Sequence, residues 1–326
     1  MTPKTRGRAR LPPSRGLAAL TLACALSAAA EVNITVAADG SGQFTNVQSA
    51  ISNAPCASAT NPVVIHIKPG LYRELVYAQR EKRFIKLLGQ DPRTTIITFD
   101  LYASVTGPNG KPIGTFRTPT VWIDADDFAV ENVTFENAAG PKGQALALRV
   151  DGDRVAFRNC RFLGWQDTIL DSRGRHYYED CEIAGHVDFI FGAGTSWFEN
   201  CRILCRGDGY ITAASTPETQ AYGFVFNHCS VTGDKPEART YLGRPWRPYA
   251  SVLFMNCEMA DVIRSEGWNN WRDPSREKTA RYAEFHNTSP GADASRRVAW
   301  AKQLTAAQAQ SITPGSILAG PDHWRP

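Results

Sequence analysis

The segments FRNCRF (157 to 162) and YEDCEI (178 to 183) repeat one pattern at a distance of 21 residues. The same pattern recurs at FENCRI (198 to 203), FNHCSV (226 to 231) and FMNCEM (254 to 259), and VENVTF (130 to 135) carries Val133 in the cysteine position. The steps between these positions are 27, 21, 20, 28 and 28 residues. Repeats of this length are typical of solenoids. Each segment alternates apolar and polar residues, which predicts a short strand with one buried face.

Short strands separated by glycine-containing turns favour coils that wind in one direction. We therefore predict an all-β fold, a right-handed parallel β-helix. The alternative is an antiparallel sandwich whose strands resemble one another by chance. A short helix is expected near the N-terminal end, with Thr45 as its N-cap, Gln48 three residues later and an apolar stripe of Val47, Ala50 and Ile51. A solenoid needs such a cap over its exposed apolar end.

The first thirty residues have the composition of a secretory signal peptide. An apolar run from Leu17 to Leu26 precedes Ala28-Ala29-Ala30, and no acidic residue is present. The basic residues of this segment are Lys4, Arg6, Arg8, Arg10 and Arg15. We expect cleavage near Ala30 and a secreted, extracellular protein without stable membrane insertion. Retention in a periplasm or a lipid anchor on Cys24 are the less favoured alternatives.

The leader also accounts for the basic balance of the chain. The whole sequence has 36 basic and 32 acidic residues, a net charge of +4. Without the five basic residues of the leader the charge is −1, so bulk charge gives no reason to expect a nucleic acid partner. Residues 31 to 326 are predicted to form a single β-helix domain. Cys181 and Cys201, one coil apart, could form a disulfide or remain buried thiols.

Two acidic residues share one phase of the repeat. Asp167 and Asp188 each follow the cysteine of a repeated segment, Cys160 and Cys181, by seven residues. Parallel strands lie roughly 4.8 Å apart, so the two carboxylates should be stacked on adjacent coils. At about 5 Å and an effective dielectric of 20 they repel by roughly 3 kcal/mol, or about two pKa units. Gln166 precedes Asp167, and Gln144 lies one coil earlier, so two glutamines should flank the pair.

The motifs around these residues resemble those of the pectin methylesterases. The similar stretches are QALAL (144 to 148), GWQDT (164 to 168), DFIFG (188 to 192), YLGRPW (241 to 246) and GLYRE (70 to 74). They occur in one order, and the resemblance extends from about Val36 to Leu318.

The resemblance implies an esterase that hydrolyses the C6 methyl ester of galacturonic acid in pectin, without a metal or other cofactor. By motif position, Asp188 would be the nucleophile and Asp167 the general acid and then base. Gln144 and Gln166 would hold the oxyanion. Arg244 would lower the pKa of Asp188, leaving the proton on Asp167. The resemblance places four aromatic residues in the cleft as sugar-binding surfaces: Phe116, Phe191, Trp246 and Trp268.

Other residues near the motifs are expected to be structural or to modify the site. Trp165 and Trp271 are interpreted as structural, and Asp208 as a turn residue. His186 stands where many relatives of this kind carry threonine; it is interpreted as a hydrogen-bonded surface histidine that could change the pH response of Asp188. The turn from Asp171 to Arg175 is particular to this chain, and its basic residues could touch the polymer.

Two other functions fit part of the sequence. One is a different β-helix enzyme on acidic polysaccharide, a lyase or a glycosidase, since two carboxylates about 5 Å apart also suit a retaining glycosidase. A lyase would need calcium with six to eight oxygen ligands, whereas this site mixes two acids with glutamine and arginine. The other is a non-catalytic carbohydrate-binding solenoid, which leaves the stacked acids unexplained. We expect a monomer whose partner is methylated pectin.

Overall fold

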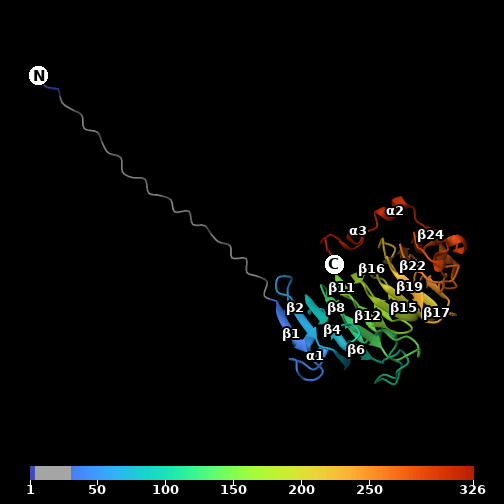
Figure 1. The fold of residues 1–326 in the computed structure, drawn as a ribbon, viewed down its shortest axis with the longest axis horizontal. Coiled ribbons are helices and arrows are strands. Elements are labelled where there is room, and N and C mark those ends of the chain that lie inside the picture. The colour runs from blue at the N-terminus through green and yellow to red at the C-terminus, as the bar shows by residue number, and fades with distance from the viewer. Residues whose placement is uncertain (4–30) are drawn as a thin grey trace.

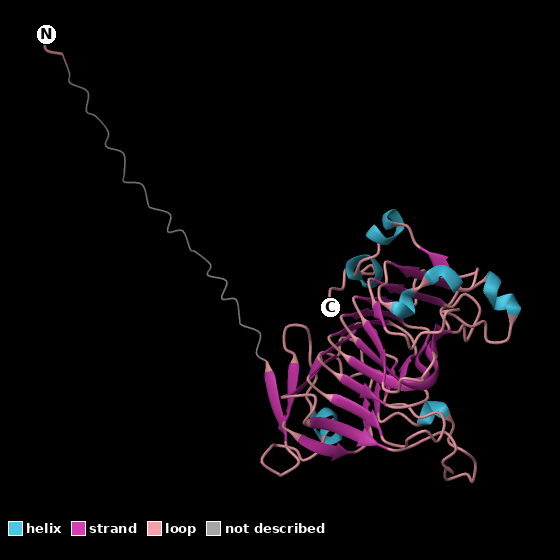
Figure 2. Cartoon of the chain, turned by 45° about the vertical axis from the view of Figure 1, so that its right-hand side comes forward, coloured by secondary structure: helices cyan, strands magenta, loops and turns pink. Residues whose placement is uncertain are grey.

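Successive turns of the chain stack on one another along a single axis, as Figures 1 and 2 show. The computed structural model describes residues 1–3 and 31–326; the expected leader therefore lies almost entirely outside the described residues. Every ladder between named strands of the described residues is parallel, for example β11 (Val155–Arg158) with β14 (Arg175–Glu179) and β12 (Arg161–Leu163) with β15 (Glu182–Gly192). The predicted right-handed parallel β-helix is confirmed, and the antiparallel alternative is wrong.

One face of the coil is an eleven-stranded sheet within the described part of the chain. Its register follows the repeat, since Phe157 pairs with Tyr178 and Tyr178 with Phe198. In spatial order the strands are β1 (Val32–Val36), β2 (Val63–Ile67), β5 (Ile85–Gly89), β8 (Ala129–Glu131), β11 (Val155–Arg158), β14 (Arg175–Glu179), β16 (Thr195–Glu199), β18 (Phe224–Asn227), β21 (Ser251–Met255), β23 (Arg281–Phe285) and β24 (Lys302–Gln303).

The other two faces are continuous because the two longest strands turn the corner between them. These are β15 (Glu182–Gly192) and β17 (Arg202–Ala214). Their first halves extend the face of β3 (Gly70–Arg73), β6 (Thr95–Phe99), β9 (Thr134–Asn137), β12 (Arg161–Leu163), β19 (Ser230–Gly233) and β22 (Glu258–Met259). Their second halves extend the face of β4 (Val76–Ala78), β7 (Val121–Ile123), β10 (Leu148–Val150), β13 (Ile169–Asp171) and β20 (Thr240–Gly243).

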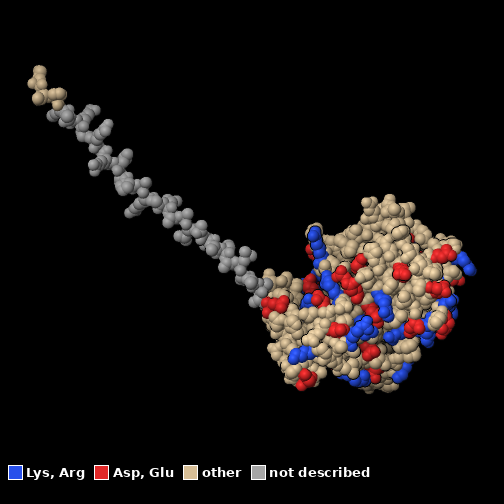
Figure 3. Space-filling view, viewed as in Figure 1, with Lys and Arg blue, Asp and Glu red and all other residues tan. Residues whose placement is uncertain are grey.

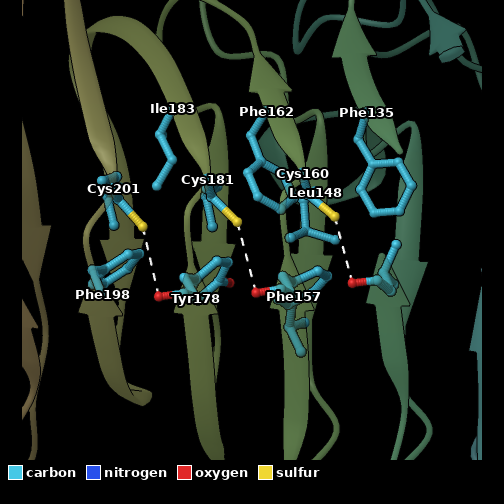
Figure 4. Close-up of a cluster of buried hydrophobic side chains, with 14 of the residues drawn as sticks. Phe135, Leu148, Phe157, Cys160, Phe162, Tyr178, Cys181, Ile183, Phe198 and Cys201 are labelled. Atoms are coloured by element: carbon cyan, nitrogen blue, oxygen red, sulfur yellow. Dashed lines mark hydrogen bonds between the residues drawn. The ribbon is translucent and has the colours of Figure 1, made fainter. Parts of the chain in front are cut away.

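The repeated cysteines form a column inside the coil, shown in part in Figure 4. Each thiol donates a hydrogen bond to a backbone carbonyl of the preceding coil, as Cys181 does to Phe157 at 3.7 Å and Cys201 to Tyr178 at 3.6 Å. Cys181 and Cys201 are free thiols in this structure. The small, weakly polar thiol thus fills the interior while its donor stays satisfied.

A column of aromatic rings accompanies the cysteines. The rings of Phe157, Tyr178, Phe198, Phe226 and Phe254 stack in sequence, with centroids 4.8, 4.6, 4.4 and 4.3 Å apart. Such pairs contribute about 0.5 to 1.5 kcal/mol each beyond the area they bury. The first letter of each repeated segment is therefore the main interior packing position.

The residue directly before the cysteine position of each repeated segment turns the chain at a corner of the coil. Asn159, Asp180 and Asn200 there have φ values of 47°, 55° and 53°. Asn, Asp and His enter this left-handed region more readily than other residues with a β-carbon. The same corner is occupied by Asn132, His228 and Asn256. This conformational demand explains why the third letter of the pattern is restricted to three residue types.

The N-terminal end carries helix α1 (Val47–Asn53), whose Val47, Ala50 and Ile51 are buried as predicted. The expected N-cap was wrong by one residue, because Asn46 accepts from the amide of Ser49 at 2.8 Å. The orphan amides of Val47 and Gln48 are bound at 2.8 Å each by the Glu74 carboxylate. A side chain 27 residues away completes the cap, which local sequence could not indicate.

The C-terminal segment runs back along the eleven-stranded face and ends beside its middle strands (Figures 1 and 2). Its helices are α2 (Ala306–Gln310) and α3 (Pro314–Leu318); short 3₁₀ turns cover Thr115–Arg117, Pro274–Lys278, Pro290–Ala292 and Ala294–Arg296. Ile312 and Leu318 pack against Trp197 and Val225 on the outside of the sheet. This segment covers apolar strand positions that would otherwise face water.

The surface seen in Figure 3 interleaves acidic and basic side chains rather than presenting a field of one sign. Arg154, for example, lies 2.6 Å from Asp127 and 2.7 Å from Asp153. No helix in residues 1–3 and 31–326 has the length and apolar character needed to cross a membrane.

Candidate active site

Asp167 and Asp188 occupy the same position on adjacent coils. The pairs Leu163 with Ala184 and Ile169 with Ile190 have one common offset of 21 residues, and the two aspartates lie between these pairs. The Asp167 amide donates to the Val187 carbonyl at 3.0 Å. Both carboxylates face the same pocket. The structure therefore brings the two predicted acids together through the register of the repeat.

Both aspartates have left-handed backbone conformations, with φ of 64° at Asp167 and 51° at Asp188. Residues with a β-carbon adopt this region at a cost of roughly 1 to 3 kcal/mol, which the surrounding structure must offset. Asp188 lies inside a long strand, where extended backbone would be the ordinary conformation. The conformation is held by the flanking ladder pairs and re-aims both carboxylates out of the regular side-chain alternation.

The two glutamines pair with each other on adjacent coils, next to the two acids. Gln144 and Gln166 form an isolated parallel bridge, and the Ala145 amide donates to the Gln166 carbonyl at 3.1 Å. The extra residues before Gln144 therefore loop out without changing its register. The Ala103 amide donates to the Gln144 carbonyl at 2.9 Å, so the long excursion after β6 is fastened to this pair. Both glutamine side chains line the pocket.

Arg244 makes a two-point ion pair with Asp188. Its Nε donates to Oδ1 at 2.9 Å and its Nη2 to Oδ2 at 2.6 Å. Parallel paired hydrogen bonds of this kind fix the plane of the carboxylate as well as its charge. Only 8% of the Asp188 side chain and 20% of the Arg244 side chain are exposed.

The electrostatic surroundings of the two acids differ, and so do the causes that shift their pKa values. Burial, and after it the charge of Asp188, raise the pKa of Asp167 to about 8, and the charge of Arg244 opposes the rise. Burial also raises the pKa of Asp188, but the hydrogen bonds from Arg244, its charge and that of His186 all oppose this. Arg244 thus acts on Asp188 in the predicted direction, but burial outweighs it and the pKa of Asp188 is raised overall. Asp167 is therefore the carboxyl that keeps its proton to higher pH, while Arg244 favours the ionised form of Asp188.

The pocket encloses about 290 Å³. It contains all five residues predicted to be catalytic and three of the four predicted aromatic surfaces, Phe116, Phe191 and Trp246. Phe191 and Trp246 meet edge to face with centroids 5.8 Å apart, whereas Phe116 is 49% exposed at the rim. Thr115, Ala213 and Trp271 complete the lining.

The prediction that Trp268 lines the cleft is wrong. Trp268 is 1% exposed, packs on Tyr282 and donates from Nε1 to buried Glu284 at 3.1 Å. Trp271, interpreted from sequence as structural, lines the pocket instead. Two tryptophans three residues apart in an irregular segment could not be assigned to inside and outside, because no strand or helix period applies there.

His186 is half-buried, whereas the sequence predicts a surface histidine. Its ring meets Trp165 edge to face at 5.5 Å, and within residues 31–326 its Nδ1 has no hydrogen-bond partner. Burial lowers the pKa of His186. The histidine is close enough to Asp188 for its charge to favour the ionised carboxylate.

The turn from Asp171 to Arg175 is mostly committed to the fold. Arg175 binds Asp153 and Asp322 at 2.5 Å each and the Leu318 carbonyl at 3.0 Å, which ties the C-terminal segment to the coil. Asp171 is fully buried. Of the two arginines, only Arg173 keeps an exposed side chain, and neither lines the pocket. Contact of Arg175 with the polymer is therefore excluded.

Asp208 does not have the place that the sequence predicts for it. Asp208 lies within β17, not in a turn; its exposed carboxylate accepts from the Arg239 amide at 2.8 Å, outside the pocket.

Among the described residues, 1–3 and 31–326, no group of three or more His, Cys, Asp and Glu side chains is arranged to hold a metal ion.

The fold and the site define a parallel β-helix protein that holds two acidic residues and an arginine in one pocket. Comparison with known proteins identifies the family. The pectinesterase family model matches residues 33–321, so the chain belongs to the pectinesterase family and is an esterase. It is 40% identical over 299 residues to pectinesterase 31 of Arabidopsis thaliana, covering 90% of this chain and 94% of that protein.

Solved structures agree with this assignment. The pectin methylesterase from carrot superposes with a TM-score of 0.83 at 36% identity, covering 89% of this chain and 94% of that one. A pectin methylesterase in complex with a hexasaccharide superposes with a TM-score of 0.77 at 28% identity, covering 90% of this chain and 99% of the other.

Proposed function

We propose that this protein hydrolyses the C6 methyl ester of galacturonate units in pectin, releasing methanol and acidic pectin. The observation that carries the proposal is the pairing of buried Asp167, whose pKa is raised to about 8, with an Asp188 carboxylate held by Arg244. Ester hydrolysis through an acyl enzyme needs one anionic nucleophile and one proton donor at the same carbonyl. The family membership supports the same substrate class.

In the first half-reaction an Asp188 oxygen attacks the ester carbonyl carbon, and the carbonyl electron pair moves to its oxygen. Gln144 and Gln166 stabilise this oxyanion with their amide N–H groups. Among the described residues neither amide group is engaged by another side chain or by backbone, and both face the pocket. The intermediate collapses, the bond to the methoxy oxygen breaks, and Asp167 gives that oxygen its proton, so methanol leaves.

In the second half-reaction water attacks the acyl carbon of the anhydride formed with Asp188. Asp167, now ionised, takes a proton from this water. Collapse of the second tetrahedral intermediate breaks the bond to Asp188 and restores its carboxylate to Arg244. The galacturonate product departs as a carboxylic acid that ionises in water. One residue thus serves as acid and then as base, and each cycle returns the site to its starting protonation.

Aromatic residues of the cleft position the sugar chain. Phe116 at the rim and the edge-to-face pair of Phe191 and Trp246 present apolar surface in the pocket that holds the acids. Flat apolar faces suit the C–H faces of sugar rings. Trp271 replaces Trp268 in this set. The polymer is then bound mainly through its rings, with the methyl ester directed at Asp188.

The proposed cellular setting follows from the sequence of residues 1–30. A basic start, an apolar run and small residues before position 31 suit export and cleavage. We propose that the β-helix acts outside the cytoplasm as a monomer on pectin, as a single domain over residues 31–326.

The test is methanol release from methylated pectin with EDTA present, together with the chain length of the product. The proposal predicts stoichiometric methanol and acid with no shortening of the polymer. New reducing ends or unsaturated ends in place of methanol would reject it in favour of a glycosidase or a lyase.

A further inference from the structure

The guanidinium of Arg244 is covered on both faces by aromatic rings. Its Cζ lies 3.8 Å from the ring centroid of Tyr210 and 3.8 Å from that of Trp271. Two rings cannot both lie this close to one carbon on the same face without overlapping, so they cover opposite faces. Each contact is a cation–π interaction, which strengthens when the cation is shielded from water. Arg244 is therefore constrained in its plane by Asp188 and across its plane by the two rings.

Tyr210 is held by the sheet. It lies in β17, pairs in register with Tyr241 of β20, and stacks on that ring with centroids 5.4 Å apart and an interplanar angle of 11°. The Arg264 guanidinium lies over Tyr241 at 5.2 Å. Nothing in the described chain is hydrogen-bonded to the Tyr210 hydroxyl. The ring face is therefore the part of Tyr210 that contributes at Arg244.

Trp271 is held by a strained loop. Trp271 and the next residue, Arg272, have left-handed φ values of 61° and 57°. The Trp271 amide donates to Asn269 Oδ1 at 2.8 Å, and the Arg272 amide to Asn270 Oδ1 at 2.9 Å. Left-handed backbone is unusual for a bulky aromatic residue and is retained where the surroundings impose it. Here the strain presents the indole face to Arg244.

We propose that Tyr210 and Trp271 are positioning residues that hold the Arg244 guanidinium coplanar with the Asp188 carboxylate. The inference rests on the proposed function, in which Asp188 must be ionised and aimed at the ester. Without a ring on one face, water reaches the guanidinium and the side chain can rotate away from the two-point geometry. The Asp188 carboxylate would then be less well aimed at the ester, and its pKa would rise, so that less of it is ionised at a given pH. Tyr210 and Trp271 act through Arg244, although Trp271 also reaches the pocket.

The cleanest test is Tyr210→Leu, because Tyr210 does not line the pocket that holds the acids. We expect a roughly 10-fold loss of kcat, the size of one shielded cation–π contact, with KM little changed. The acidic limb of the kcat/KM profile should move to higher pH. Arg244 and His186 are the charges that favour ionised Asp188, Asp167 is the neighbouring titratable group, and only Arg244 is loosened. Tyr210→Phe keeps the ring and should restore both values.

The matched control is Tyr241→Leu, which removes the neighbouring ring of the same stack without touching Arg244. It should lower the melting temperature about as much as Tyr210→Leu but leave the acidic limb in place. An equal shift in both variants, or a loss of kcat in Tyr210→Leu with no shift, would overturn the inference in favour of a structural role. If Tyr210→Leu does not fold, Trp271→Leu in the surface loop must show the same shift.

Arg244→Ala separates this inference from the proposed function. Methanol release that survives Arg244→Ala contradicts the role of Arg244 in the proposed mechanism itself. Loss of turnover in Arg244→Ala together with wild-type kinetics in Tyr210→Leu would leave the mechanism standing and reject only the positioning role of the rings.

Discussion

The cysteine column and the aspartate pair lie seven residues apart on the same coils, one inside the β-helix and one outside. Inside, stacking identical residues is favourable, because each thiol finds a carbonyl of the preceding coil and each aromatic ring stacks on the next. Outside, the same register stacks two carboxyl groups in one pocket, where burial and then the charge of Asp188 raise the pKa of Asp167 to about 8. The same stacking of equivalent residues on adjacent coils therefore stabilises the interior of the β-helix and creates a reactive pair on its exterior.

The difference shows what has to be added to a repeat to make a site. The interior column needs only its own members. The exterior pair needs residues from outside its rungs: Arg244, 56 residues beyond Asp188, and the rings that cover it. The following variants test whether the two columns are as separate as this comparison requires.

The largest effect is expected for Asp188→Asn. Asparagine keeps the shape and tolerates the left-handed backbone, but it removes the nucleophile, so kcat should fall by a factor of about 10⁴ or more. Methanol release checks the rate, and a melting curve checks that folding is intact. A folded Asp188→Asn enzyme with near wild-type turnover would assign the nucleophile elsewhere.

A smaller loss is expected for Gln166→Leu, which deletes one proposed oxyanion donor while keeping similar volume. Removal of a single donor costs about 10² to 10³ in kcat in comparable sites. KM should change little, because the donor acts mainly on the charge that develops in the transition state. Gln144→Leu is the partner variant on the same bridge and should behave alike; an effect confined to KM in both would indicate substrate binding instead.

Phe198→Ala tests the interior column. Phe198 is fully buried and stacks between Tyr178 and Phe226, so its truncation should lower the free energy of unfolding by about 3 to 5 kcal/mol. Denaturant unfolding measures this. The acidic and basic limbs of the activity profile should stay where they are in the folded fraction. A shifted pH profile would mean that the inside of the coil also sets the pKa values outside.

Asp167→Asn is expected to stabilise the protein in a pH-dependent way. The folded pKa of Asp167 is about 8 and its usual value 3.8, so the folded wild type binds more protons than the unfolded chain between these values. Wild-type stability therefore falls as pH rises from about 4 to 8, and this contribution disappears in the variant. The advantage of Asp167→Asn should grow across that window to about 1 to 3 kcal/mol. A constant difference from pH 4 to 9 would argue against a raised pKa.

Much of this organisation could be predicted from the sequence, because a repeat converts linear spacing into stacking. The strands and the stacking of Asp167 on Asp188 follow from it. The pairing of Gln144 with Gln166 does not follow from spacing alone, because extra residues precede Gln144. Features outside the repeat could not be predicted in the same way. The cap of α1 depends on distant Glu74, and the exchange of Trp268 for Trp271 depends on an irregular loop with left-handed residues.

The signal that could have found Trp271 and Tyr210 is faint. Asn269 and Asn270 before Trp271 are residues that stabilise turns with their own side chains, which hints at a shaped loop. Tyr210 and Tyr241 occupy paired positions only after the register of β17 and β20 is known. Contacts between a motif residue and a ring from another coil require the three-dimensional register, which spacing alone does not supply for excursions of unequal length.

The central claim is that Asp167 holds a proton at neutral pH beside an ionised Asp188. The direct measurement is a ¹³C NMR titration of carboxyl-labelled aspartate in the folded enzyme, with the Asp167 and Asp188 signals assigned by their loss in the two asparagine variants. Our account predicts that the Asp167 carboxyl titrates near pH 8 and Asp188 well below it. Titration of both carboxyls near pH 4, or of Asp188 above Asp167, would contradict it.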